Sequence, residues 1–172
     1  MTSDRGPVAF LFDQDEALSG LLREVVRRKG IYLFFGNDDL DTLSTNERRI
    51  YVGAKLLDPS GELVARYHKI QLVPFGEYVP LQRFFTLGGR FTAKLVQEVS
   101  DFTPGTEAVT GVVDGHRVGG FICYEAIFPS LVRRFAAGGA ELLVNITNDA
   151  WYGTTSAPHQ HLAMVAFRAI EN

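Results

Sequence analysis

The stretch that most constrains the fold is Arg117 to Pro129, which reads RVGGFICYEAIFP. It holds the only cysteine of the chain, Cys123, at the end of an apolar run, and a helical pattern begins at Pro129. A thiol between a strand and a helix lies near free N–H groups and partial positive charge, and both favour the thiolate. A lone cysteine can equally be a small buried hydrophobic residue. The stretch alone therefore leaves two interpretations, a nucleophile or a core cysteine.

Composition excludes several classes of protein. The chain has 172 residues, of which 46% are hydrophobic, enough for one domain, residues 1–172, with a substantial core. A net charge of −3 is too small for a surface that binds nucleic acid. The sequence contains no run of about 18 apolar residues, so it predicts no transmembrane helix. A single cysteine rules out an internal disulfide and a cysteine-based zinc site.

Metal binding through histidine is not expected either. His159 and His161 lie near the start of a predicted helix. They are two positions apart, so on a helix they point in different directions and cannot share a metal as an i, i+4 pair can. The sequence therefore indicates neither a metal nor another cofactor.

The hydrophobic pattern predicts helices alternating with strands. The predicted elements are a helix over 13–30, a buried strand over 31–36, a polar loop over 37–48, a hairpin of strands 49–57 and 63–68, a long loop over 81–105, a second hairpin of strands 108–113 and 116–123, a helix over 129–137, a strand over 141–146 and a helix over 158–170. This order predicts an α/β protein with mixed sheet pairing and helices on both sheet faces.

Two charged residues between the hairpins are candidates for a site. Lys69 follows the strand over 63–68, where a side chain can project beyond the sheet. Glu77 lies in the loop QLVPFGEYVP, which Pro74 and Pro80 stiffen. Either residue taken alone is typical of a solvated surface charge.

Four runs of sequence, taken together, carry a resemblance to a known family. They are YHKIQLVPFGEYVPL, FTPG, CYEAIFPSLVRR and NITNDAWYGTTSAPHQHLAMVAFRAIEN. In this order they resemble the nitrilase-type domain of apolipoprotein N-acyltransferases, and the PFGEYVP and NDAWYG runs favour that branch of the carbon-nitrogen hydrolase superfamily. The resemblance spans nearly the whole chain. It implies an α-β-β-α sandwich that is incomplete at both ends.

The resemblance also implies roles for individual residues. Cys123 would be the nucleophile, Lys69 the triad lysine, and Glu77 a supporting glutamate. Tyr124, Glu125 and Trp151 would bind substrate or support the site. Lys69 would stabilise the oxyanion that forms when the thiolate attacks an ester carbonyl.

The implied reaction moves an acyl chain from a phospholipid, through a cysteine thioester, to the N-terminal amine of an apolipoprotein. The implied partners are thus a phospholipid donor and an apolipoprotein acceptor, with no nucleic acid. The implied location is the bacterial inner membrane, with the domain facing the periplasm and membrane association provided by segments that this chain lacks.

One part of the family pattern is missing. The general-base glutamate of the family lies in a WPE-like segment before the first helix, and the N-terminal run MTSDRGPVAFLF contains no such segment. Asp4 lies near that position, but it is shorter and its context differs, and Glu16 already belongs to the predicted helix. We therefore expect a fragment of a longer enzyme, or an eroded copy, that is inactive or very slow alone.

Two other functions remain open at this point. A soluble carbon-nitrogen hydrolase acting on amides or nitriles would use the same cysteine and lysine. A non-catalytic remnant or binding module would explain the missing glutamate.

Overall fold

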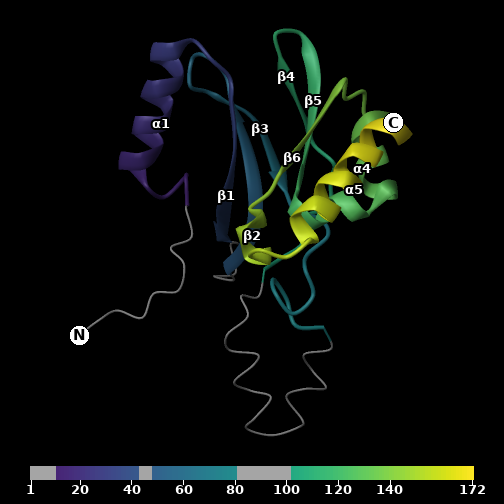
Figure 1. The fold of residues 1–172 in the computed structure, drawn as a ribbon. Helices are drawn as coiled ribbons and strands as arrows, with labels where there is room; N and C mark the ends of the chain where they lie inside the picture. Colours follow the sequence, from purple (N-terminus) through teal and green to yellow (C-terminus); the bar gives the residue numbers. More distant parts are fainter. Residues whose placement is uncertain (1–10, 43–47, 81–101) are drawn as a thin grey trace, which may run out of the picture.

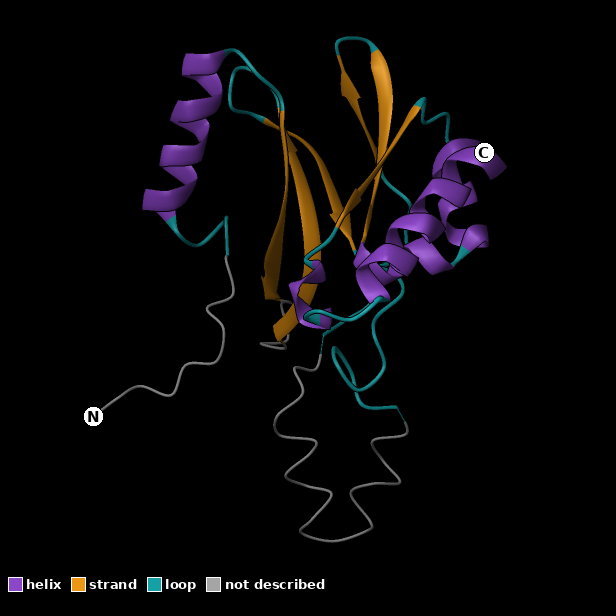
Figure 2. Cartoon of the chain, viewed as in Figure 1, coloured by secondary structure: helices purple, strands orange, loops and turns teal. Residues whose placement is uncertain are grey.

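The computed structural model describes residues 11–42, 48–80 and 102–172. Its elements are α1 (Glu16–Lys29), β1 (Leu33–Thr42), β2 (Arg48–Leu57), β3 (Leu63–His68), β4 (Thr110–Val113), β5 (His116–Ile122), the 3-10 helix η2 (Cys123–Ile127), α4 (Pro129–Ala137), β6 (Leu142–Ile146), the 3-10 helix η3 (Asp149–Tyr152) and α5 (Ala157–Glu171). The two sheets lie between α1 on one side and α4 with α5 on the other (Figures 1 and 2). The predicted α-β-β-α sandwich is confirmed.

Each sheet of the sandwich has three described strands. The first sheet has the order β1-β2-β3 and is antiparallel throughout. In the second sheet, β4 pairs with β5 antiparallel and β5 pairs with β6 parallel. The mixed pairing predicted from the sequence is therefore present. Asp4 and most of the predicted loop over 81–105 lie outside the described residues.

The sequence-based prediction for β1 was wrong beyond Gly36. A loop was predicted over 37–48, but β1 continues to Thr42 and pairs with β2 from Asn37 opposite Gly53 to Thr42 opposite Arg48. The run NDDLD suggested a loop because Asn and Asp are depleted in strands. Two of these polar residues, Asn37 and Asp39, are buried on the face of the sheet that α1 covers. The Asn37 side-chain amide donates a hydrogen bond to the Asp39 carboxylate there.

Helix α1 has the ends that its sequence predicts. The Asp15 carboxylate accepts a hydrogen bond from the Leu18 N–H at 3.0 Å, and Gly30 closes the helix with φ +61°. A left-handed residue after the last turn favours glycine because it has no Cβ. Val26 faces inward and is fully buried in a small cluster with Phe12 and Leu57.

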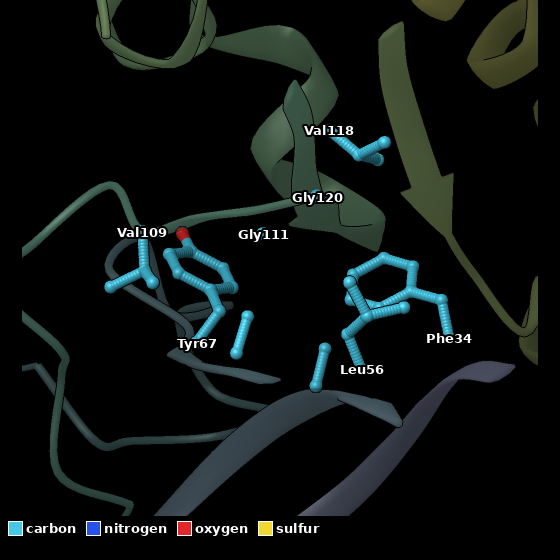
Figure 3. A pocket seen from close by; sticks show the side chains of 9 residues that line it. Phe34, Leu56, Tyr67, Val109, Gly111, Val118 and Gly120 are labelled. Atoms are coloured by element: carbon cyan, nitrogen blue, oxygen red, sulfur yellow. The ribbon is translucent and has the colours of Figure 1, made fainter. Parts of the chain in front are cut away.

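The two sheets approach closely at glycines of the second sheet. A Cβ atom on Gly120 would overlap the Phe34 ring, and one on Gly111 would press on the Leu56 side chain. A small apolar cavity lies between the sheets at this level, lined by Phe34, Leu56, Tyr67, Val109, Val118 and Gly120 among others (Figure 3). Its lining carries the Tyr67 hydroxyl as its only side-chain polar group, so we regard the cavity as part of the packing between the sheets.

A charged cluster occupies the opposite face of the first sheet, beneath α1. The Lys55 side chain is fully buried and forms ion pairs with Asp39 and, at 3.2 Å, with Asp13. His68 Nε2 lies 2.9 Å from the second Asp39 oxygen. Burial raises the pKa of Asp39, but hydrogen bonds from His68, Lys55 and Asn37 outweigh it and hold this pKa well below its usual range. Asp39 therefore remains a carboxylate at neutral pH.

Replacing Asp39 with asparagine tests this cluster. Asp39→Asn leaves the buried Lys55 ammonium without its closest counter-charge, so we expect the free energy of unfolding to fall by about 3 kcal/mol. Asp41→Asn, at an exposed position of the same strand, is the matched control and should change stability by less than about 0.5 kcal/mol. Denaturant unfolding followed by circular dichroism measures both. Equal stability of the two variants would contradict the inferred role of the cluster.

Candidate active site

Cys123 lies at a sharp turn directly after β5. It is the first residue of η2 and has φ +47°, in the left-handed region. For a residue with a Cβ this conformation costs on the order of 1–2 kcal/mol, so surrounding contacts must hold it. The side chain is partly buried and packs against the main core. The turn thus presents the thiol at the end of a central strand.

The surroundings of the thiol differ from the prediction in one respect. The sequence predicted that Cys123 ends the strand and adjoins the N-terminus of the following helix. In the structure β5 ends at Ile122, the five-residue η2 follows, and α4 begins only at Pro129. The α4 N-terminus is therefore not the direct neighbour of the thiol.

Glu125 is fully buried and accepts four hydrogen bonds. The donors are the Tyr67 hydroxyl at 2.7 Å and the backbone N–H groups of Ile70 at 2.7 Å, Gln71 at 3.0 Å and Ile122 at 2.7 Å. Burial, the charge of Glu125 and this hydrogen bond raise the pKa of Tyr67, so its hydroxyl stays protonated and donates. Glu125 is therefore saturated as an acceptor, and it orders the backbone around the site.

These hydrogen bonds join the two chain segments that carry the candidate residues. Ile70 directly follows Lys69, and Ile122 directly precedes Cys123. Both N–H groups point at the Glu125 carboxylate, one at each of its oxygens. The segment after β3 and the end of β5 therefore meet around one buried charge.

Lys69 is almost completely buried, with 1% of its side chain exposed, and it pairs with Glu77. Lys69 Nζ donates to Glu77 Oε1 at 2.6 Å, and Glu77 Oε2 accepts from the Val73 N–H at 2.9 Å. The structure thus pairs two residues that, taken alone, are typical of surface charges and that the family resemblance placed in one site. A buried ammonium with a single described carboxylate partner keeps its positive charge available to an anion that forms nearby.

Three further side chains lie at Cys123. The Cys123 carbonyl oxygen accepts from His161 Nε2 at 3.0 Å and from Asn145 Nδ2 at 3.4 Å. Tyr152 lies near the Cys123 side chain; burial and then the charge of Cys123 raise the pKa of Tyr152. The sequence analysis assigned no role to Asn145 or Tyr152. A polar residue inside an otherwise apolar strand, as in LLVNI, was the available signal for Asn145.

The two histidines of α5 diverge, as their spacing predicts. His161 is buried, whereas His159 is exposed. In the described part of the chain no group of three or more His, Cys, Asp or Glu side chains is arranged to hold a metal ion.

The two aromatic candidates, Tyr124 and Trp151, lie in the 3-10 helices η2 and η3. The Tyr124 ring packs edge-on against Phe128, with ring centroids 5.2 Å apart. Trp151 lies in η3, close in sequence to Tyr152, and its side chain is outside the description.

Residues 7–172 match the family model of the carbon-nitrogen hydrolases. The chain belongs to this family. It is 47% identical over 127 residues to the apolipoprotein N-acyltransferase of Geobacter metallireducens, a match that covers 73% of this chain and 24% of that protein. It is 40% identical over 159 residues to apolipoprotein N-acyltransferase 1 of Treponema pallidum, covering 88% of this chain and 29% of the relative. The chain thus spans about a quarter of the length of these relatives.

Solved structures of an amidase from Nesterenkonia sp. AN1 share the fold. A mutant of this amidase in complex with butyramide is 27% identical to the chain, with a TM-score of 0.57, and the match covers 93% of this chain and 51% of the amidase. Another mutant, which shows the result of Michael addition of acrylamide at the active site cysteine, is 28% identical with a TM-score of 0.56.

Among the described residues of our chain, no helix has the length and apolar character needed to cross a membrane.

Replacing Glu125 with glutamine tests its role as the organising acceptor. In Glu125→Gln, the amide NH₂ must face at least the Ile122 N–H, which needs an acceptor, so we expect a loss of about 3 kcal/mol in unfolding free energy. Tyr67→Phe removes only one of the four donors and should cost about 1 kcal/mol. Chemical denaturation measures both variants. A Glu125→Gln protein as stable as Tyr67→Phe would show that the carboxylate charge is not required.

Proposed function

We propose that this domain carries out the acyl transfer of an apolipoprotein N-acyltransferase, with Cys123 as the nucleophile. The observation that carries the proposal is the meeting of a strained thiol at the end of β5 with the segment that bears the buried Lys69–Glu77 pair. Identity of 40–47% to apolipoprotein N-acyltransferases supports this substrate class.

The first half of the proposed reaction forms a thioester. The Cys123 thiolate attacks the carbonyl carbon of a phospholipid ester, and a carbon–sulfur bond forms while the carbonyl oxygen becomes an oxyanion. The Lys69 ammonium stabilises this negative charge. Collapse of the intermediate breaks the carbon–oxygen bond, and the lysophospholipid leaves as an alcohol after it takes up a proton.

The second half transfers the acyl group to the acceptor. The N-terminal amine of an apolipoprotein attacks the thioester, the carbon–sulfur bond breaks, and Cys123 leaves as the thiolate. The amine must lose a proton in this step, and a general base accepts it. In this proposal Tyr124 and Trp151 bind substrate or support the site, and Glu125 supports the backbone on which Cys123 stands.

Neither glutamate that the structure places at the site is free to be that base. Glu77 binds Lys69 and the Val73 N–H, and Glu125 accepts four hydrogen bonds. We therefore expect residues 1–172 on their own to form the thioester slowly. In this proposal the domain works at the periplasmic face of a bacterial inner membrane, and segments other than 1–172 attach it there.

A second candidate is a carbon-nitrogen hydrolase that cleaves amides. The amidase with butyramide bound has the same fold over 93% of this chain, which favours this alternative. It would use the same thiol and lysine, with water in place of the amine.

Mass spectrometry of the acylated protein tests the proposed function. After incubation with phosphatidylethanolamine in detergent, we expect one acyl chain on the peptide that contains Cys123, removable by neutral hydroxylamine. Cys123→Ala should show no adduct. Lys69→Met should slow its formation by about a hundredfold, because the oxyanion loses its cation.

The other outcomes separate the alternatives. Hydrolysis of butyramide without phospholipid would favour the hydrolase. No adduct on a folded protein whose thiol still reacts with iodoacetamide would favour a non-catalytic remnant and would overturn the proposed function.

A further inference from the structure

Cys123 needs an anchor because its backbone conformation is unfavourable. A residue with a Cβ remains at φ +47° only where its neighbours over-determine it. The peptide that follows the thiol is fixed through the Cys123 carbonyl oxygen. This oxygen accepts one hydrogen bond of ordinary length, from His161 at 3.0 Å, and a long one from Asn145 at 3.4 Å.

His161 is itself held rigidly. It lies near the start of α5 and is 6% exposed. Its Nδ1 is 3.0 Å from Asp149 Oδ1, which also accepts the Thr147 hydroxyl at 2.7 Å. Hydrogen bonds from Thr147 and from His161 both lower the pKa of Asp149, although its slight burial opposes them, so Asp149 is a carboxylate at neutral pH.

The hydrogen-bond roles of the imidazole follow from its partners. A carbonyl oxygen can only accept, so Nε2 donates to Cys123, and Nδ1 lies 3.0 Å from the Asp149 carboxylate. The ring thus links η3 to the nucleophile turn through one contact at each nitrogen. The same ring also packs edge-on against Tyr152, with centroids 6.5 Å apart, and Tyr152 lies near the Cys123 side chain.

We infer that His161 is a positioning residue for the nucleophile: its Nε2–H holds the Cys123 carbonyl, and its ring packs against Tyr152, which lies near the thiol. The inference rests on the proposed function in taking Cys123 as the nucleophile. His161 does not reach the reacting atoms itself. It acts by fixing the direction in which the sulfur points, and a small misdirection of an attacking atom is costly in rate.

Paired amide substitutions at position 161 test this role. In His161→Gln the amide nitrogen can take the place of Nε2 and still donate to the Cys123 carbonyl. In His161→Asn the shorter amide takes the place of Nδ1, so the contact with Asp149 remains while the contact with Cys123 is lost. His159→Asn, on the exposed side of the same helix, is the matched control.

The readout is the rate at which iodoacetamide alkylates the thiol of the full chain, which has only one cysteine. We expect His161→Asn to lower this rate about tenfold and His161→Gln to retain most of it. His159→Asn should match the unmodified protein. Thermal melts of all variants separate a positional effect from unfolding, and acylation from phosphatidylethanolamine should follow the same order.

The outcomes distinguish this inference from the proposed function. Equal alkylation rates in the Asn and Gln variants, whether both high or both low, would overturn the positioning role and leave the nucleophile intact. A thiol in the unmodified protein that reacts no faster than in the urea-unfolded chain would instead count against Cys123 as a nucleophile.

Discussion

The carboxylate of Glu125 is the interaction on which the site depends. A buried charge without partners costs several kcal/mol, so the four donors around it are in effect obligatory. Two of them are backbone N–H groups just after Lys69, and one is the N–H just before Cys123. Satisfying one carboxylate therefore forces the segment after β3 and the end of β5 into contact.

Hydrogen bonds on both sides of Cys123 explain how this residue keeps its left-handed conformation. The Ile122 N–H, which belongs to the peptide before the one that joins Ile122 to Cys123, is fixed by Glu125, and the Cys123 carbonyl is fixed by His161. Because the chain is held on both sides of Cys123, this residue cannot relax to an ordinary strand conformation. The stability of the two sheets and of α5 thus offsets the cost of the left-handed turn.

Much of the fold could be predicted from the sequence, because hydrophobic periodicity and turn chemistry report local structure. The helix predicted over 13–30 and the hairpin of strands predicted over 108–113 and 116–123 are examples. The polar run after Gly36 could not be assigned, because Asp39 is stabilised in the strand by partners far along the chain, Lys55 sixteen positions away and His68 twenty-nine positions away. The role of His161 was hidden for the same reason. Its partners lie on η2 and η3, and no local pattern connects them.

The residues at the end of β3 show that the contacts of Asp39 and those of Glu125 require the same pairing of β2 with β3. Side chains alternate between the two faces of a strand, so His68 joins the Asp39 cluster beneath α1 while Tyr67 turns toward Glu125 in the other direction. A shift of one residue in the pairing of β2 with β3 would exchange these faces. It would turn His68 toward Glu125 and remove the His68 contact from Asp39. The two charged clusters on opposite faces therefore specify the same register, and that register brings Lys69 to the site.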